Sequence, residues 1–226
     1  MSPRKLGTIT IGQAPRADIT PILDAALPPA LPRQHVGLLD GLDRDAIAHR
    51  FGPRPGHPVL VSRLLDGGSV TVDKERAEAV IQERVTQLED EGCTTILLLC
   101  TGRFDQLTTR AAALIEPERI LAPSLPALAA GRQVGILVPL AEQIASEGEK
   151  WRALERRPIF AAASPYDGDE APLVAAARSL RDRGAELLMT DCMGFCERHR
   201  EVAREASGLP VVIANAVIAK LVAEIV

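Results

Sequence analysis

The sequence predicts an α/β protein of two pseudo-symmetric αβα lobes, each with a mainly parallel sheet, and a cleft between the lobes. Segments with strand and helix signals alternate along all 226 residues, which is the pattern of parallel strands joined by helices. Apolar residues make up 46% of the chain and aromatic residues 3%, an aliphatic composition typical of an α/β protein. A five-residue pattern also occurs twice, which indicates two similar halves.

In this pattern, Leu, Asp, Gly, Cys and Gly recur at a constant offset of 92 residues, with no gap. The matched pairs are Leu88 and Leu180, Asp90 and Asp182, Gly92 and Gly184, Cys100 and Cys192, and Gly102 and Gly194. An internal duplication explains this match and supplies one thiol from each half.

The first half contains apolar runs that predict strands and spaced apolar positions that predict helices. In chain order we expect a strand at 5–11, a turn at 12–16, a helix at 17–26, a strand at 34–39, hairpin strands at 59–64 and 69–72, a long helix from 73 to 92 and a strand at 94–99. Asp66-Gly67-Gly68 provides the hairpin turn. Asp73 caps the long helix, and Gly92 ends it.

The second half restarts after a Pro/Ala segment at 123–131. The expected elements are a strand at 133–138, a helix to 156, a strand at 158–163, a helix at 170–183, a strand at 185–190, a helix at 194–207, a strand at 210–214 and an amphipathic helix at 216–226. Its first strand, Val134-Gly-Ile-Leu137, mirrors Leu6-Gly-Thr-Ile9.

Composition excludes several classes of function. A net charge of −4 without a basic block argues against nucleic acid or an anionic membrane as partner. The first residues lack the apolar run of a signal peptide, and no stretch is apolar enough to span a membrane. We therefore expect a cytoplasmic protein whose four cysteines are reduced, with Cys93 as a small buried apolar residue.

Cys100 and Cys192 each end an apolar strand, and the glycine two residues later is expected to begin a turn into a helix. Ligands of open α/β sheets bind at the carboxyl ends of strands. Helix N-terminal amides there favour a thiolate and hold a carboxylate. If the lobes face each other, one thiolate can remove a proton beside a carboxylate while the other thiol returns one to the opposite face. The alternative is that both cysteines only fill space at the sheet ends.

The paired strand-end cysteines resemble those of the aspartate/glutamate/hydantoin racemase superfamily. A closer resemblance, to the AroM family, rests on Thr10-Ile-Gly-Gln-Ala-Pro-Arg-Ala-Asp-Ile19, on Gly37-Leu-Leu-Asp40 and on both cysteine turns. It covers essentially the whole chain, and the Gly-Gln-Ala-Pro-Arg segment is its most specific part. It implies that the C-terminal helix packs back on the first lobe, giving lobes of 1–122 with 215–226 and of 123–214. It does not imply a substrate.

The better-known racemases usually have Asn-Thr after the first cysteine and Thr after the second. This chain has Thr101-Gly102 and Met193-Gly194 at those places, so we expect a different substrate. The wider superfamily also contains decarboxylases and isomerases that use one or both thiols.

Further candidates lie near the same strand ends. Gln13 and Arg16 follow the first strand, and Arg16 either clamps a carboxylate or pairs with Asp18 or Asp40. Asp40 either binds a substrate amine, orients Arg16 or caps the next helix. Asn215 either reaches the substrate or caps the last helix.

Asp191 is expected to be a structural hydrogen-bonding residue. Cys192, Cys196 and His199 are spaced for one helical face but lack a fourth ligand, so we expect no metal there. His35, His49 and His57 receive no role, and no nucleotide-binding glycine motif is present.

The sequence thus predicts a cofactor-independent, racemase- or epimerase-like enzyme acting on a small carboxylate, and a possible homodimer. Cys100 and Cys192 would form the acid/base pair. The residues expected to bind the substrate are Gln13, Arg16, Asp40, Thr101, Gly102, Met193, Gly194 and Asn215. The alternatives are a one-cysteine isomerase or decarboxylase, a non-catalytic small-acid binding or regulatory protein, and a redox switch between Cys192 and Cys196.

Overall fold

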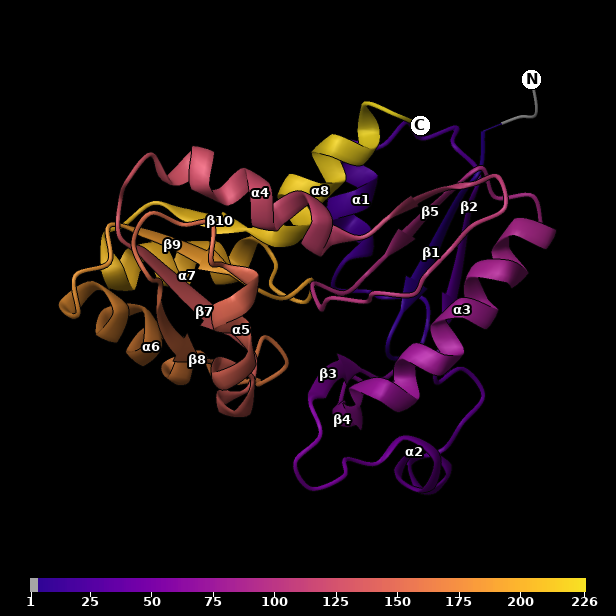
Figure 1. The fold of residues 1–226 in the computed structure, drawn as a ribbon, viewed down its shortest axis with the longest axis horizontal. Coiled ribbons are helices and arrows are strands. Elements are labelled where there is room, and N and C mark those ends of the chain that lie inside the picture. Colours follow the sequence, from indigo (N-terminus) through magenta and orange to yellow (C-terminus); the bar gives the residue numbers. More distant parts are fainter. Residues whose placement is uncertain (1–3) are drawn as a thin grey trace. The chain divides into compact units, whose positions relative to one another are not determined.

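Two structural units, each built on a four-stranded parallel sheet, make up the computed structural model, which describes residues 4–226 (Figure 1). The first unit runs to Pro117 and includes Ala219–Val226. The second unit is Glu118–Ile218. The predicted fold class, two lobes with parallel sheets, is confirmed.

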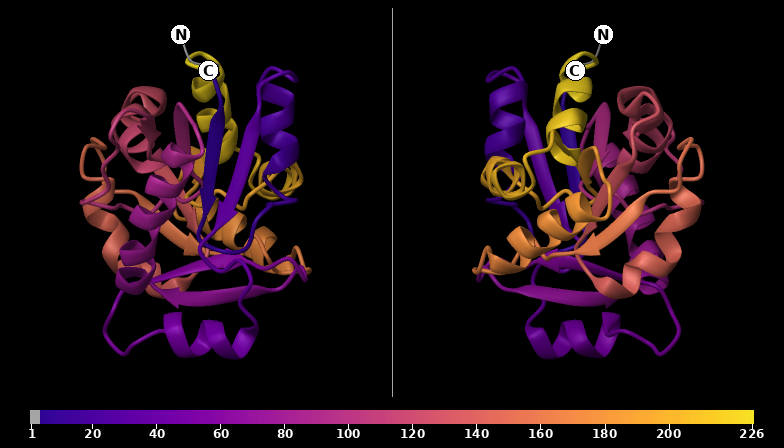
Figure 2. Two further views of the ribbon diagram at one scale, coloured as in Figure 1. Left: turned by 90° about the vertical axis from the view of Figure 1, so that its right-hand side faces the viewer. Right: turned by 90° about the vertical axis from the view of Figure 1, so that its left-hand side faces the viewer.

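The first unit has the strand order β2-β1-β5-β6, with a separate antiparallel hairpin of β3 and β4. Its elements are β1 (Leu6–Thr10), α1 (Thr20–Ala26), β2 (Arg33–Gly37), α2 (Arg44–Phe51), β3 (Val59–Arg63), β4 (Ser69–Asp73), α3 (Lys74–Asp90), β5 (Thr95–Leu98) and β6 (Ala113–Ile115). The hairpin and α2 lie beyond the end of the sheet, as both views of Figure 2 show.

The second unit has the order β10-β9-β7-β8. Its elements are α4 (Pro117–Ala129), β7 (Val134–Val138), a 3-10 turn (Ala141–Gln143), α5 (Ile144–Lys150), β8 (Ile159–Ala162), α6 (Ala171–Asp182), β9 (Leu187–Thr190), α7 (Glu197–Ser207), β10 (Val211–Ile213) and α8 (Ala214–Ala223). The end of α8 belongs to the first unit.

The two sheets have the same topology. Read from the other edge, the second sheet is β8-β7-β9-β10, which matches β2-β1-β5-β6 strand for strand. The strands that precede the two cysteines, β5 and β9, therefore hold equivalent places. This agreement extends the duplication from five residues to a whole sheet.

The repeated Leu and Gly residues end equivalent helices in the same way. The N–H of Cys93 donates to the carbonyl of Leu88 at 2.9 Å, and the N–H of Ala185 donates to that of Leu180 at 3.0 Å. Between them, Gly92 and Gly184 have φ values of +83° and +93°, which a side chain would strain.

A second matched glycine lets these helices approach their sheets. A Cβ on Gly7 of β1 would lie 2.7 Å from Leu88 Cδ1, and one on Gly135 of β7 would lie 3.2 Å from Leu180 Cβ. Both leucines are fully buried. The repeated aspartates differ, since Asp90 pairs with Arg110 and Asp182 with Arg181, and the structure gives them no common role.

The structure corrects the predicted boundaries in several places. The Pro/Ala segment is no break, because Pro123 and Pro126 lie inside α4, where burial of Leu121 and Leu125 outweighs the missing hydrogen bonds. The helix expected to reach residue 156 ends at Lys150. The helix expected after Asp40 is α2, and its N-cap is Asp43 rather than Asp40. The sequence prediction named no element at β6. Within residues 4–226, no helix is both long enough and apolar enough to cross a bilayer.

Candidate functional site: two thiol turns

Cys100 lies two residues beyond the end of β5 and is half-buried. The N–H of Gly102 donates to its sulfur at 3.3 Å. A Cβ on Gly102 would lie 3.3 Å from Leu60 of β3 and 3.5 Å from Phe104, so these apolar side chains pack against this turn. The intervening Thr101 is buried.

Cys192 lies two residues beyond the end of β9 and is buried. The N–H of Gly194 donates to its sulfur at 3.4 Å, which repeats the geometry of Cys100. A backbone donor to sulfur favours the charged thiolate over the thiol. The spacing repeated within the duplication thus places each sulfur in the same kind of turn.

The expected helix N-termini are not where the sequence predicted them. The chain after Cys100 stays irregular until β6, and α7 begins only at Glu197, with Cys196 at its N-cap. Cys192, Cys196 and His199 therefore do not share one helical face. The donors at the two thiols are turn amides rather than a helix end.

Asn215 holds the second turn in place. It lies in α8, and its Nδ2 donates to the backbone carbonyls of Met193, at 2.9 Å, and Phe195. Both Asn215 and Met193 are almost fully buried. Asn215 is therefore not the N-cap of the last helix but a support for the Cys192 turn.

Gln13 joins the loop after β1 to its neighbours in the first unit. Its Nε2 donates to the carbonyls of Leu39 and Leu42 at 3.2 and 3.0 Å, and its Oε1 accepts from the N–H of Leu65 at 3.0 Å. Asp40 makes similar bonds, accepting from the N–H groups of Ala14 and Gly37. Both side chains are engaged with backbone.

Arg16 is a buried cation in the same loop. Its guanidinium pairs with Asp18 through two bonds of 2.8 and 2.6 Å and donates to Thr10 and to Ser62 of the hairpin. Of the two pairings considered from the sequence, the structure shows the one with Asp18. Arg16 thereby ties β1 to the hairpin that presses on Gly102.

A buried ion pair lies directly before Cys192. Asp191 accepts from Lys150 at 2.5 Å and from the indole N–H of Trp151 at 3.1 Å. Glu147 lies 3.6 Å from Lys150, and burial, followed by the charge of Asp191, raises the pKa of Glu147 to about 7. Asp191 is thus a structural hydrogen-bonding residue.

Tyr166 is a site residue that the sequence analysis missed. Its hydroxyl lies 3.6 Å from the sulfur of Cys192, and its ring covers Gly194. It comes from the loop between β8 and α6, at the carboxyl end of a strand of the same sheet. Extending the strand-end rule to every parallel strand would have selected this loop.

Cys196 and His199 form a separate pair at the start of α7. The N–H of Cys196 donates to His199 Nδ1 at 2.9 Å, which places the proton of a neutral ring on Nε2. A separate side-chain hydrogen bond between His199 and the Cys196 thiol lowers the pKa of this thiol, whereas burial raises the pKa of the Cys93 thiol.

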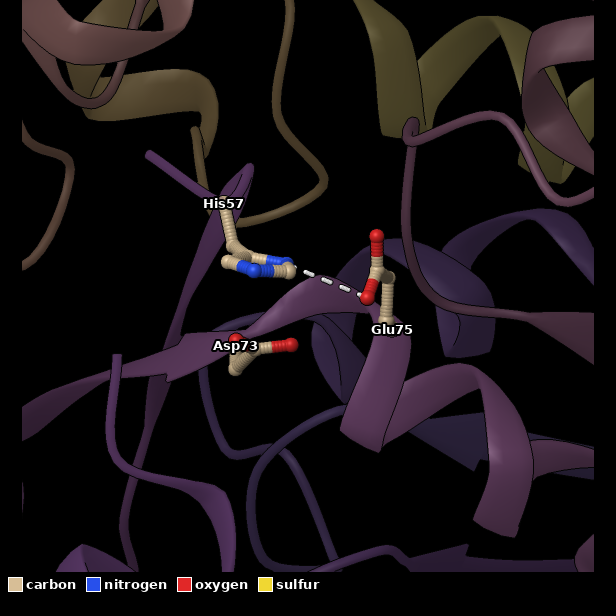
Figure 3. A group of neighbouring side chains, drawn as sticks. All are labelled: His57, Asp73 and Glu75. Atoms are coloured by element: carbon tan, nitrogen blue, oxygen red, sulfur yellow. Dashed lines mark hydrogen bonds and ion pairs between the residues drawn. The ribbon is translucent and has the colours of Figure 1, made fainter. Parts of the chain in front are cut away.

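One cluster in the first unit has the composition of a metal site. Ligand atoms of His57, Asp73 and Glu75 lie within 4.8 Å of one another, and Figure 3 shows His57 and Glu75 turned toward each other. Arg54 already donates to both oxygens of Asp73 and to Glu75. Asp73 also caps α3. The guanidinium fills the place of a cation, so we interpret the cluster as an ion-pair network.

Known proteins were compared with this chain in sequence and in structure. A family model described as AroM protein matches residues 6–226. No curated protein gives a match. Among solved structures, allantoin racemase from Klebsiella pneumoniae has a TM-score of 0.57 at 13% identity, over 98% of this chain and 86% of that chain.

Two further solved structures share the fold. Glutamate racemase isoform RacE1 from Bacillus anthracis has a TM-score of 0.60 at 11% identity, over 100% of this chain and 82% of that chain. The maleate isomerase Iso from Pseudomonas putida S16 has a TM-score of 0.55 at 12% identity, over 96% and 89%. At these identities the likeness establishes the fold.

Proposed function

Because the chain belongs to the AroM family and has the fold of racemases and an isomerase, we propose that it is a cofactor-independent enzyme of the racemase/isomerase type. Its substrate is a small carboxylate, and its acid/base groups are Cys100 and Cys192. The observation that carries the proposal is the repeated turn, in which a glycine N–H supports each sulfur at equivalent strand ends.

The proposed reaction is a balanced proton exchange at the carbon next to the carboxylate. One cysteine, as thiolate, removes the α-proton, and the electron pair moves into the carboxylate to give an enediolate. The other cysteine, as thiol, donates a proton to the opposite face and becomes the thiolate. Charge and protons are conserved, and the reverse direction exchanges the roles of the two sulfurs.

The carboxylate needs donors near each sulfur. We assign this role to the backbone around Thr101, Gly102, Met193 and Gly194, since turn amides stabilise developing negative charge. Gln13, Arg16, Asp40 and Asn215 act indirectly in this proposal. Their described bonds hold the loop after β1, the hairpin and the Cys192 turn.

A second candidate, chemistry at one thiol, is favoured by the unequal surroundings of the two turns. Leu60 and Phe104 press on Gly102, whereas the Tyr166 phenol covers Gly194. An isomerase or decarboxylase that uses one sulfur would need only one of these environments.

Solvent deuterium exchange tests the proposal. The protein in D2O is mixed with a panel of 2-substituted acids, including amino, hydroxy and arylmalonic types, and the α-carbon is followed by NMR. We expect one class to acquire deuterium, and we expect Cys100→Ala and Cys192→Ala each to abolish exchange. Cys93→Ala serves as the matched control.

Loss of exchange in only one variant would move the assignment to one-thiol chemistry. A ligand that raises the melting temperature, with no exchange or turnover of any panel member, would instead indicate a small-acid binding protein.

A further inference from the structure

The structure places the Tyr166 hydroxyl beside the Cys192 sulfur, a contact that no sequence feature indicated. Its hydroxyl oxygen and the Cys192 sulfur are 3.6 Å apart, a separation at which an O–H can donate to sulfur. The loop that carries Tyr166 is itself held, because the N–H of Tyr166 donates to Ser164 Oγ at 3.1 Å.

The glycine of the repeat makes room for this contact. A Cβ on Gly194 would lie 2.5 Å from the Tyr166 hydroxyl oxygen and 2.6 to 2.7 Å from its ring carbons. Any side chain at Gly194 would therefore displace the ring. Gly194 serves two purposes, since its N–H reaches the sulfur while its missing side chain admits the phenol.

We propose that Tyr166 is a further catalytic residue, whose hydroxyl donates a hydrogen bond to the Cys192 thiolate and keeps this sulfur ready to act as the base. Its catalytic meaning rests on the proposed function. The hydrogen bond itself concerns only groups of the second unit.

Together the N–H of Gly194 and the hydroxyl of Tyr166 give the sulfur two donors. Donors that point at a sulfur stabilise its anionic form, because a thiolate accepts hydrogen bonds more strongly than a thiol. Tyr166 thus adds a side-chain donor to the backbone donor of the second turn.

Site-resolved alkylation tests the inference without a substrate. A Cys196→Ser background leaves Cys192 as the single cysteine of its tryptic peptide, and iodoacetamide labelling of Cys192 and Cys100 is followed across pH by mass spectrometry. Tyr166→Phe keeps the ring over Gly194 but removes the hydroxyl.

We expect Tyr166→Phe to slow Cys192 labelling at neutral pH by roughly tenfold, which corresponds to a rise of about one unit in the pH midpoint. The limiting rate at high pH and the Cys100 profile should not change. An unchanged or lowered midpoint for Cys192, or an equal shift for both cysteines, would overturn the inference.

The composition offers a second measurement, because Tyr166 is the single tyrosine of the chain. Growth with 3-fluorotyrosine therefore labels this position alone. We expect its fluorine resonance to follow the ionisation of Cys192 and to lose that dependence in Cys192→Ala. The same pH dependence in both proteins would contradict the proposed bond.

The two proposals can fail separately. If deuterium exchange occurs but Tyr166→Phe does not shift the pH profile of Cys192 labelling, the role of Tyr166 is refuted and the role of the two thiols stands. A shifted profile without exchange on any acid would keep the hydrogen bond and remove the proposed reaction.

Discussion

Single residues of this protein decide how each thiol behaves. Cys100 and Cys192 receive glycine N–H groups, Cys196 is paired with His199, and Cys93 is buried beside a helix end. One residue type thus meets three environments within one chain. Because the thiolate is the reactive form, these environments predict different reactivities.

We predict that Cys196 is alkylated faster than Cys93 at neutral pH. The side-chain hydrogen bond of His199 lowers the pKa of the Cys196 thiol, and desolvation raises the pKa of the Cys93 thiol. His199→Ala should slow Cys196 labelling by up to about tenfold per unit of lost pKa shift. His49→Ala, a change at an exposed histidine of α2, should leave it unaltered. Faster labelling of Cys93 in mass-spectrometric time courses would refute this order.

At the scale of elements, the Gly-Gln-Ala-Pro-Arg motif connects the loop after β1 to the hairpin of β3 and β4. A Cβ on Gly12 would lie 2.1 Å from the carbonyl oxygen of Arg63, so the loop after β1 and the hairpin touch backbone to backbone. Gln13 and Arg16 add polar bonds to the same hairpin. The hairpin then delivers Leu60 to the Cys100 turn.

Gly12→Ala should therefore destabilise the protein by more than about 2 kcal/mol, because neither backbone segment can move away cheaply. Gly148→Ala is the control, since a Cβ there meets open space in α5. That substitution should be neutral or stabilising by up to about 1 kcal/mol. Thermal unfolding measures the effect of both substitutions. Equal melting temperatures for Gly12→Ala and wild type would show that the backbone contact between Gly12 and Arg63 is not rigid.

The Glu147 cluster predicts a pH dependence of stability. The charged groups facing Glu147 are Lys150 and Asp191. Its folded pKa, about 7, exceeds the ordinary carboxyl value of 4.5, so the folded state holds a proton that the unfolded state has lost between these values. The stability from protonated Glu147 is therefore lost as pH rises through about 7.

Glu147→Gln stays neutral and should gain stability over wild type between about pH 5 and about pH 8, by up to about 3 kcal/mol. Glu149→Gln, at an exposed carboxylate of the same helix, is the control. Melting temperatures across this range decide the matter, and a constant gap between Glu147→Gln and wild type would rule out the buried protonated carboxyl.

At the scale of the whole molecule, the sequence predicted best the elements that occur in both halves. Leu88 and Leu180, and the glycines that follow them, end equivalent helices because burial and a positive φ each allow few residue types. The pattern therefore predicted the strands that lead to both cysteines. The strand order then extended the duplication to all four strands of each parallel sheet.

The sequence predicted poorly where tertiary packing overrides local preference. Pro123 and Pro126 suggested a break but lie within α4, whose apolar residues are buried. The roles of Tyr166 and Lys150 depend on contacts across 26 and 41 residues, which no local pattern encodes. Local signals predict elements, and long-range contacts decide which side chains reach a sulfur.

For the whole molecule, the proposed function requires that both thiols act on one α-carbon. The most direct measurement uses a single enantiomer of the acid identified by exchange, turned over in D2O to low conversion. Deuterium is then measured separately in the product and in the recovered substrate. A pair of cysteines on opposite faces predicts deuterium in the product and almost none in the recovered substrate. Equal deuterium in both would mean that one sulfur removes and returns the proton, and would contradict the acid/base pair.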